Sequence, residues 1–398
     1  MANLHDTLQA HVGGAAAPGA VALVARGDEV EVQAVGTSDV EGTRPMSRDS
    51  IFRIASITKP IVAAAVMMLV DDGLMALDDP IERWLPELAS LSVVRAPSSP
   101  VDDVVPAVRS ITVSDLLTFR AGWGFPSDFS FPAVALLFND LLQGLPEPAR
   151  VAAPDEWIAA LARIPLLHQP GDAWLYNTCS DIQGVLLARA TGRSLDELLG
   201  ERVFEPLGMV DTAFEVPPGK RNRFTSFYRA GTEGALELVD APEGQWGALP
   251  RFPSGAGGLV STVDDWLAFA RLLLSDGQVG DRRLLSKESV RLMTTDHLTP
   301  AQRDAAASFL EGQGWGYGGS VDVAPGDPWN VPGRYGWVGG TGTSAYITPS
   351  TGAVSILMTQ LELAGPTPPG VMRAFWTHAA AAEAQPSSST TGSPAARS

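Results

Sequence analysis

The sequence predicts an α/β (α+β) protein in which an antiparallel sheet flanked by helices is built from both ends of the chain, with a mostly helical domain inserted between them. Two alternating apolar runs near the N-terminus and two near the C-terminus supply strands. The segment between them is dominated by helical patterns and Pro-rich loops. We therefore expect residues 1–78 and 250–384 to form the sheet domain, 79–249 the helical domain, and 385–398 a disordered tail.

The N-terminal elements are a hairpin followed by a helix. Residues 20–25 and 30–35 alternate, and the Arg-Gly-Asp-Glu turn at 26–29 between them is typical of a β-hairpin. Residues 56–70 then have helical composition, since Pro60 is tolerated in a first turn and the Asp-Asp-Gly sequence that follows ends the helix.

The C-terminal elements are a capped helix, a second strand pair and a last helix. The Ser-Thr-Val-Asp-Asp sequence at 261–265 predicts a helix over 266–274, because a hydroxyl and early acidic side chains satisfy and stabilise a helix N-terminus. Strands are expected at 343–348 and 353–360 around a four-residue turn, and a helix at 371–383.

Composition narrows the classes of function. The 398 residues are 45% hydrophobic and 18% charged, which fits a folded globular protein. A net charge of −17 argues against nucleic-acid binding. The apolar run at 61–70 is about half the length needed to cross a bilayer, so no membrane association is expected.

Two further features bear on the location of the protein. The single cysteine, Cys179, excludes an intramolecular disulfide. The apolar stretch near the N-terminus lacks the basic flank of a secretion signal. These features predict a cytoplasmic location.

One lysine lies at a catalytic spacing from a serine. Of three lysines, only Lys59 follows a serine by three positions, giving Ser56-x-x-Lys59. On a helix such residues lie about 60° apart and about 4.5 Å along the axis, so the amine reaches the hydroxyl. The helix N-terminus stabilises a developing alkoxide and lowers the pKa of the lysine. Ser56 is therefore the predicted nucleophile and Lys59 its base.

Six segments around and after this motif form a recognisable series: FRIASITKP at 52–60, DDGLMALDDP at 71–80, ITVSDLLT at 111–118, WLY at 174–176, GAGGLVST at 255–262 and WVGGTG at 337–342. In this order they resemble the landmarks of the serine β-lactamase and penicillin-binding-protein superfamily, most closely its class C-like branch with the family VIII carboxylesterases. The resemblance spans about residues 18–362 and implies a β-lactamase/transpeptidase-like fold.

The resemblance also implies a catalytic tyrosine. In that family the tyrosine of a Y-x-N motif meets the serine and the lysine, and Tyr176 occupies its position. We expect the nearby ammonium to lower the pKa of this phenol, which then shuttles a proton; a packing role is the alternative. Thr178 replaces the motif's asparagine, and Asn177 is a partial substitute. This change weighs against the recognition of β-lactams and peptides by an amide side chain.

A second departure from the family pattern concerns the residues that contact the substrate. Where the family has K-T-G, with a lysine that binds a substrate carboxylate, this chain has Trp337-Val338-Gly339. The loss removes a contact of roughly 1.5–3 kcal/mol, whereas an indole favours apolar or aromatic esters. Gly339 allows the strand to approach the scissile carbonyl, and the family pattern makes the backbone N–H groups of Ser56 and Gly340 the oxyanion hole.

Several aromatic residues are candidates for a substrate pocket, with core packing as the alternative. With Trp337 and Gly339, the substrate-binding set comprises Trp123 and Tyr317; Phe125, Trp315 and Tyr335 are further candidates. None of the five histidines has a metal-ligand spacing, so no metal or organic cofactor is implied. Cys179 is expected to be a buried apolar residue.

The sequence therefore predicts a serine hydrolase that cleaves small-molecule carboxylic esters through an acyl-enzyme on Ser56, with Lys59 and Tyr176 as proton shuttle. An acyltransferase, a thioesterase, a D-stereospecific amidase or peptidase, and a weak β-lactamase on the same triad remain alternatives. A non-catalytic penicillin-recognising protein is the remote one.

Overall fold

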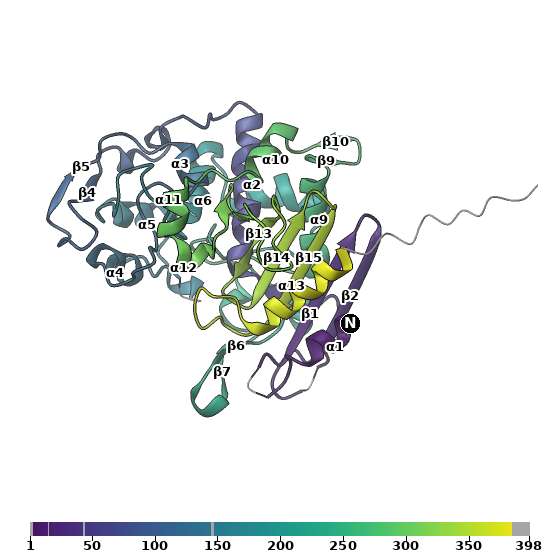
Figure 1. The fold of residues 1–398 in the computed structure, drawn as a ribbon. Coiled ribbons are helices and arrows are strands. Elements are labelled where there is room, and N and C mark those ends of the chain that lie inside the picture. The colour runs from purple at the N-terminus through teal and green to yellow at the C-terminus, as the bar shows by residue number, and fades with distance from the viewer. Residues whose placement is uncertain (1–2, 15, 43, 145–146, 384–398) are drawn as a thin grey trace, which may run out of the picture.

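A seven-stranded antiparallel sheet joins the two ends of the chain (Figure 1). The computed structural model describes residues 3–14, 16–42, 44–144 and 147–383, so the tail expected at 385–398 lies outside the described residues. The strand order is β11-β12-β13-β14-β15-β1-β2, which confirms a sheet built from both chain ends. The strands are β1 (Gly19–Arg26), β2 (Glu29–Gly36), β11 (Gly314–Trp315), β12 (Ser320–Val321), β13 (Tyr335–Gly339), β14 (Thr343–Thr348) and β15 (Ala353–Thr359).

Both predicted strand pairs are confirmed, with small shifts at their ends. β1 pairs with β2 in a register that sets Ala25 opposite Val30, and Gly27 in the turn has φ +57°. β14 pairs with β15, which ends one residue before the expected Gln360. The central pairing of β1 with β15 then joins the N-terminal hairpin to the C-terminal strands.

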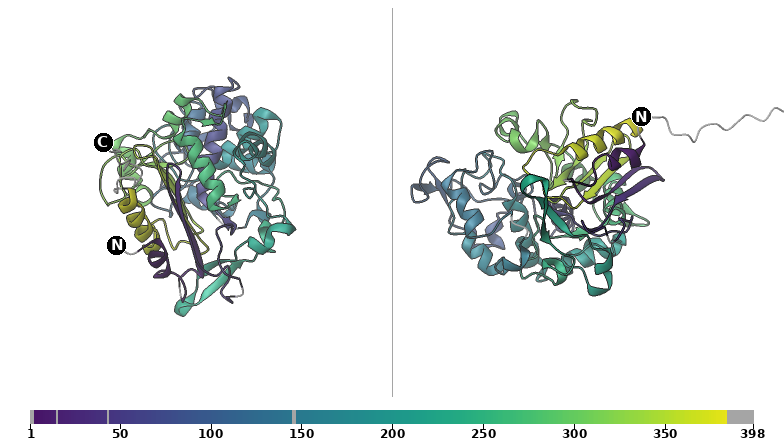
Figure 2. Two further views of the ribbon diagram at one scale, coloured as in Figure 1. Left: turned by 90° about the vertical axis from the view of Figure 1, so that its right-hand side faces the viewer. Right: turned by 90° about the horizontal axis from the view of Figure 1, so that it is seen from below.

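Helices cover both faces of the sheet (Figure 2). On the outer face, α1 (Leu4–Gln9) and α13 (Gly370–Glu383) pack on alternate residues of β1 such as Ala20 and Ala22. The intervening residues, such as Val21 and Leu23, point into the main core, and there α9 (Val263–Leu274) packs on β1, β14 and β15. Burial on both faces explains why residues 20–25 of β1 are apolar without interruption.

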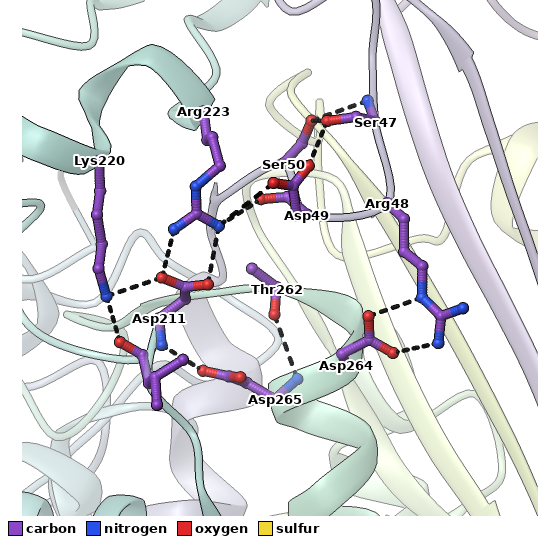
Figure 3. Close-up of polar contacts among 11 residues, drawn as sticks. Ser47, Arg48, Asp49, Ser50, Asp211, Lys220, Arg223, Thr262, Asp264 and Asp265 are labelled. Carbon is purple, nitrogen blue, oxygen red and sulfur yellow. Dashed lines mark hydrogen bonds and ion pairs between the residues drawn. The ribbon is translucent and has the colours of Figure 1, made fainter.

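The N-terminus of α9 is capped as predicted, but the helix begins earlier. The Thr262 side chain accepts a hydrogen bond from the Asp265 N–H at 3.2 Å, so the helix begins at Val263 instead of residue 266. Figure 3 shows how this end is fastened: Asp264 pairs with Arg48, and Asp265 accepts the Asp211 N–H at 2.7 Å. In the same view Asp211 pairs with Arg223 and Lys220.

The inserted region is mainly helical, with two short hairpins. β6 (Phe227–Ala230) pairs with β7 (Leu236–Asp240) and bridges Leu361, so this part lies against the sheet-side elements. The other elements of the region are β4 (Ser92–Val94), β5 (Val104–Pro106), α3 (Val113–Leu117), α4 (Pro132–Asn139), α5 (Pro154–Leu161), α6 (Thr178–Thr191), α7 (Leu195–Leu199) and α8 (Glu205–Leu207).

The helix predicted at 56–70 is divided in the structure. Residues Ala55–Thr58 form one 3-10 turn, and α2 (Lys59–Asp71) follows it. No helix among the described residues is both long and apolar enough to cross a membrane. The remaining elements are β3 (Phe52–Arg53), β8 (Val260–Ser261), β9 (Gln278–Val279), β10 (Arg282–Arg283), α10 (Lys287–Met293), α11 (Pro300–Ala305) and α12 (Ala307–Leu310).

Candidate active site

Ser56 lies in the 3-10 turn between β3 and α2, beside the end of β13. The Thr341 hydroxyl donates to the Arg53 carbonyl at 2.5 Å, and the Thr343 hydroxyl donates to the Ile54 carbonyl at 2.9 Å. Ala55 has φ +43°, a left-handed conformation that costs a non-glycine residue about 1–2 kcal/mol. The turn is thus held in place by the β13–β14 connection and presents Ser56 to a cavity.

Gly339 makes this close approach possible. A Cβ on Gly339 would lie 2.2 Å from Thr343 Oγ1 and 2.5 Å from the Ile54 carbonyl oxygen, so no larger residue fits there without displacing the turn. The next residue, Gly340, lines the cavity together with Ser56. Both residues predicted for the oxyanion hole therefore border the same cavity.

Lys59 reaches the Ser56 hydroxyl from the first turn of α2. Its Nζ lies 2.9 Å from Ser56 Oγ, 2.9 Å from Asn177 Oδ1 and 2.6 Å from the Ala256 carbonyl oxygen. Three acceptors match the three protons of an ammonium group, and a neutral amine keeps two of these bonds and turns its lone pair to the serine. The contact that the Ser-x-x-Lys spacing predicts is therefore present.

Burial tunes this amine toward the neutral form. The Lys59 side chain is fully buried, and desolvation lowers its pKa to about 7, while the carboxylate of Asp181 opposes that shift. Burial is the largest cause of the lowered pKa of Lys59, whereas the sequence analysis attributed that lowering to the helix N-terminus. A lysine with this pKa is about half deprotonated near neutral pH, which suits a general base.

The pKa of Tyr176 differs from the predicted one. Burial raises the pKa of Tyr176 to about 12, so the expected lowering by the ammonium is wrong. The largest cause is desolvation of the phenol; Lys59 Nζ lies over the face of the ring, 4.7 Å from its centre. Tyr176 therefore remains a neutral phenol that can donate a proton.

A tryptophan orients that phenol. Trp337 Nε1 donates to the Tyr176 hydroxyl at 2.6 Å. Because an indole N–H can only donate, the phenol oxygen is the acceptor of this bond, and the phenol keeps its own proton. A side-chain hydrogen bond with Ser56 also lowers the pKa of the phenol, against the larger effect of burial. The side chain that replaces the family's lysine thus also positions the tyrosine.

Asp181 is a buried charge that the sequence argument missed. It lies on α6, where it accepts hydrogen bonds from the Ser254 hydroxyl at 2.6 Å and the Ala256 N–H at 3.1 Å. Burial raises its pKa and the nearby Lys59 lowers it. A lone acidic residue in the otherwise uncharged run 173–188 was the available signal.

Asn177, not Thr178, faces the lysine. Asn177 has φ +83° at the start of α6, and its Oδ1 accepts a hydrogen bond from Lys59. Thr178 is buried and donates to Gln143 Oε1 at 2.6 Å. The side chain beside the family's asparagine position therefore makes the amide contact with Lys59.

The cavity in front of Ser56 has a volume of about 390 Å³ and mainly apolar walls. Ser56, Tyr176 and Trp337 lie on its lining with Asn177 and Asp181. The apolar walls come from distant segments, which the sequence could not bring together: Phe129, Leu141, Trp157, Trp246, Phe252 and Phe309. These walls suit the apolar or aromatic part of a substrate.

Two predicted substrate contacts are not found. The Trp123 side chain is 1% exposed and donates to the Ile164 carbonyl at 2.9 Å, and Tyr317 stacks on His297 with ring centres 4.5 Å apart. Neither of them lines the cavity, because both pack in the core beside it; the same holds for the further candidates Phe125, Trp315 and Tyr335. Cys179 is fully buried, and burial raises the pKa of its thiol to about 12.

The described part of the chain shows no candidate metal centre. No group of three or more His, Cys, Asp or Glu side chains in residues 3–14, 16–42, 44–144 and 147–383 is placed to hold a metal ion.

Catalysis should depend on the protonation of Lys59. With the neutral amine as the predicted base, kcat/KM for p-nitrophenyl butyrate should fall about tenfold per pH unit below about pH 7 and level off above it. Asp181→Asn should move this limb to lower pH, because the carboxylate raises the pKa of Lys59. A pH profile that is flat through the neutral range would contradict the assignment of the base.

The chain is similar to one protein-family model and to several known proteins. Residues 4–374 match the Beta-lactamase family model. Protein Rv1367c of Mycobacterium tuberculosis is 39% identical over 353 residues, which are 86% of this chain and 85% of that protein. Esterase EstB of Burkholderia gladioli is 32% identical over 375 residues, 88% of each chain.

Solved structures show the same architecture. EstCE1, described as a hydrolase with promiscuous acyltransferase activity, superposes with a TM-score of 0.75 at 23% identity, over 94% of this chain and 96% of that one. The β-lactamase/transpeptidase-like fold, a mixed α/β arrangement with an antiparallel sheet, is thereby confirmed.

Proposed function

As this chain belongs to the beta-lactamase family and is a serine hydrolase, we propose that it hydrolyses carboxylic esters of small molecules through an acyl-enzyme on Ser56. The observation that carries the proposal is the position of Ser56 between two proton-handling groups: the Lys59 amine at 2.9 Å and the Tyr176 phenol. We also propose the cytoplasmic location that the sequence predicts.

The first half-reaction forms the acyl-enzyme. The neutral amine of Lys59 accepts the Ser56 proton as Oγ attacks the ester carbonyl. The backbone N–H groups of Ser56 and Gly340 stabilise the negative oxygen of the tetrahedral intermediate. Tyr176 gives its proton to the departing alkoxide and recovers one from Lys59, so the alcohol leaves neutral and Ser56 holds the acyl group.

The second half-reaction repeats these transfers with water. Water takes the place of the alcohol, loses a proton to the tyrosine–lysine pair and attacks the acyl carbonyl. The acid leaves and Ser56 regains its proton. Asn177 and the Ala256 carbonyl keep the Lys59 amine in place throughout, because they bind it independently of the serine.

The indole of Trp337 favours esters over lactams. Lys59 is hydrogen-bonded to Ser56, and Arg53 is hydrogen-bonded to Asp240. Neither cation is therefore free to pair with a substrate carboxylate. We expect kcat/KM for p-nitrophenyl acetate to exceed that for nitrocefin, which carries a carboxylate, by at least about tenfold. Equal or higher efficiency on nitrocefin would assign the protein to the β-lactamases instead.

Acyl transfer to an alcohol is the second candidate function. EstCE1 combines hydrolase and acyltransferase activity on this fold, and an acyl-enzyme can pass its acyl group to any acceptor that enters the cavity. The partition between acid and new ester, measured with and without added alcohol, separates the two.

A further inference from the structure

Glu362 places a carboxylate at one side of the active-site cavity. It follows the end of β15 and lines the same cavity as Ser56 and Trp337. Its backbone is fixed on both sides, since the Glu362 N–H donates to the Tyr228 carbonyl and the Leu363 N–H donates to the Gly340 carbonyl, each at 2.8 Å. The carboxylate is therefore attached to backbone that contacts the proposed oxyanion residue.

The other charged residues on the cavity lining are engaged with the protein. Arg53 is held by Asp240 and donates to the Thr225 carbonyl at 2.6 Å. Asp181 accepts hydrogen bonds from Ser254 and Ala256. Neither charge is free to pair with a ligand.

Glu362 has no such partner. Among the described residues, no hydrogen bond or ion pair reaches its side chain, which is half-buried. The charge of Arg229 acts on it from outside hydrogen-bond contact, and the Arg229 guanidinium itself binds Glu237 at 2.9 Å. A half-buried carboxylate without a partner leaves unused capacity for a cation or a hydrogen-bond donor.

We propose that Glu362 makes the active site selective for esters that carry a cationic, ammonium-type group, and that it disfavours esters that carry a carboxylate. The proposal rests on the ester hydrolysis proposed above. Phe227 on the same cavity lining adds aromatic surface, on which an alkylated ammonium packs favourably. The net charge of −17 would also draw cationic substrates toward the protein, a long-range effect that the test must separate.

The test uses ester pairs that differ only in charge. Butyrylcholine is compared with its uncharged carbon isostere, and the p-nitrophenyl ester of a trimethylammonio-substituted acid with that of its tert-butyl isostere. The first pair carries the charge on the alcohol and the second on the acyl group, so the pair that responds locates Glu362 relative to the scissile bond. We expect kcat/KM to favour the cation by about tenfold or more in at least one pair.

Two variants test whether Glu362 causes the preference for cationic over uncharged esters. Glu362→Gln should bring the preference close to one and leave kcat/KM for the neutral isosteres within about threefold of wild type. Glu243→Gln, at an exposed glutamate outside the cavity lining, removes the same charge and should keep the preference. Equal preferences in wild type and Glu362→Gln, or equal losses in both variants, would overturn the proposal.

A measurement on the wild-type protein avoids any dependence on how the variant folds. Choline should inhibit hydrolysis of the neutral ester competitively, and its uncharged isostere should do so at least about tenfold less well. Equal inhibition by both would overturn the proposal. Failure of the wild-type protein to hydrolyse any neutral ester would instead count against the proposed function itself.

Discussion

Replacing Ser56 with alanine is expected to abolish ester hydrolysis and leave the fold intact. The acyl-enzyme needs the serine oxygen, and no second Ser-x-x-Lys motif exists to supply one, so kcat on p-nitrophenyl butyrate should fall by at least about 10⁴-fold. The fold should survive because Ser56 is half-buried and Lys59 keeps its bonds to Asn177 and Ala256. Turnover and circular dichroism are measured on the same preparation.

The control for this substitution is Ser90→Ala, which removes an exposed hydroxyl away from the cavity and should change neither quantity. A folded Ser56→Ala protein with near wild-type turnover would remove the mechanism altogether.

Lys59→Ala and Tyr176→Phe are expected to lower kcat by about 10²–10⁴-fold each. The double variant should lose much less than the product of the two, because both residues serve one proton path through Ser56. Tyr176→Phe also leaves the buried Trp337 N–H without its acceptor, which should lower the free energy of unfolding by about 1–3 kcal/mol.

Tyr335→Phe separates these two effects of the tyrosine substitution. The Tyr335 hydroxyl is buried and donates to the Tyr317 carbonyl at 2.6 Å, outside the cavity lining. Its loss should lower stability and leave kcat close to wild type. Multiplicative losses in the Lys59 and Tyr176 variants would instead show that these residues act separately, and Tyr176 would return to a packing role.

The sequence predicted those parts of the site that depend on local spacing or on family landmarks. Ser56 and Lys59 lie one turn apart, so their contact follows from helix geometry. Tyr176 and Trp337 were placed by the resemblance to the family. Their mutual hydrogen bond joins positions 161 residues apart and had no local signal.

The predictions that were wrong concern side chains whose burial is set by the three-dimensional packing. The pKa of Tyr176 is raised because packing excludes water from the phenol, and Trp123 and Tyr317 lie in the core although they carry the same kind of side chain as the cavity walls. Composition cannot tell which aromatic residues face a cavity. Glu362 had no motif of its own, and its significance lies in the absence of a partner among the described residues.

The most direct test of the proposed reaction is to map the covalent adduct that forms when the protein meets a fluorophosphonate. Mass spectrometry of the digested protein should find one adduct, on Ser56, and the Ser56→Ala variant should remain unlabelled while Ser90→Ala is labelled like wild type. An unlabelled wild-type protein that nevertheless hydrolyses esters, or an adduct on another residue, would contradict an acyl-enzyme on Ser56.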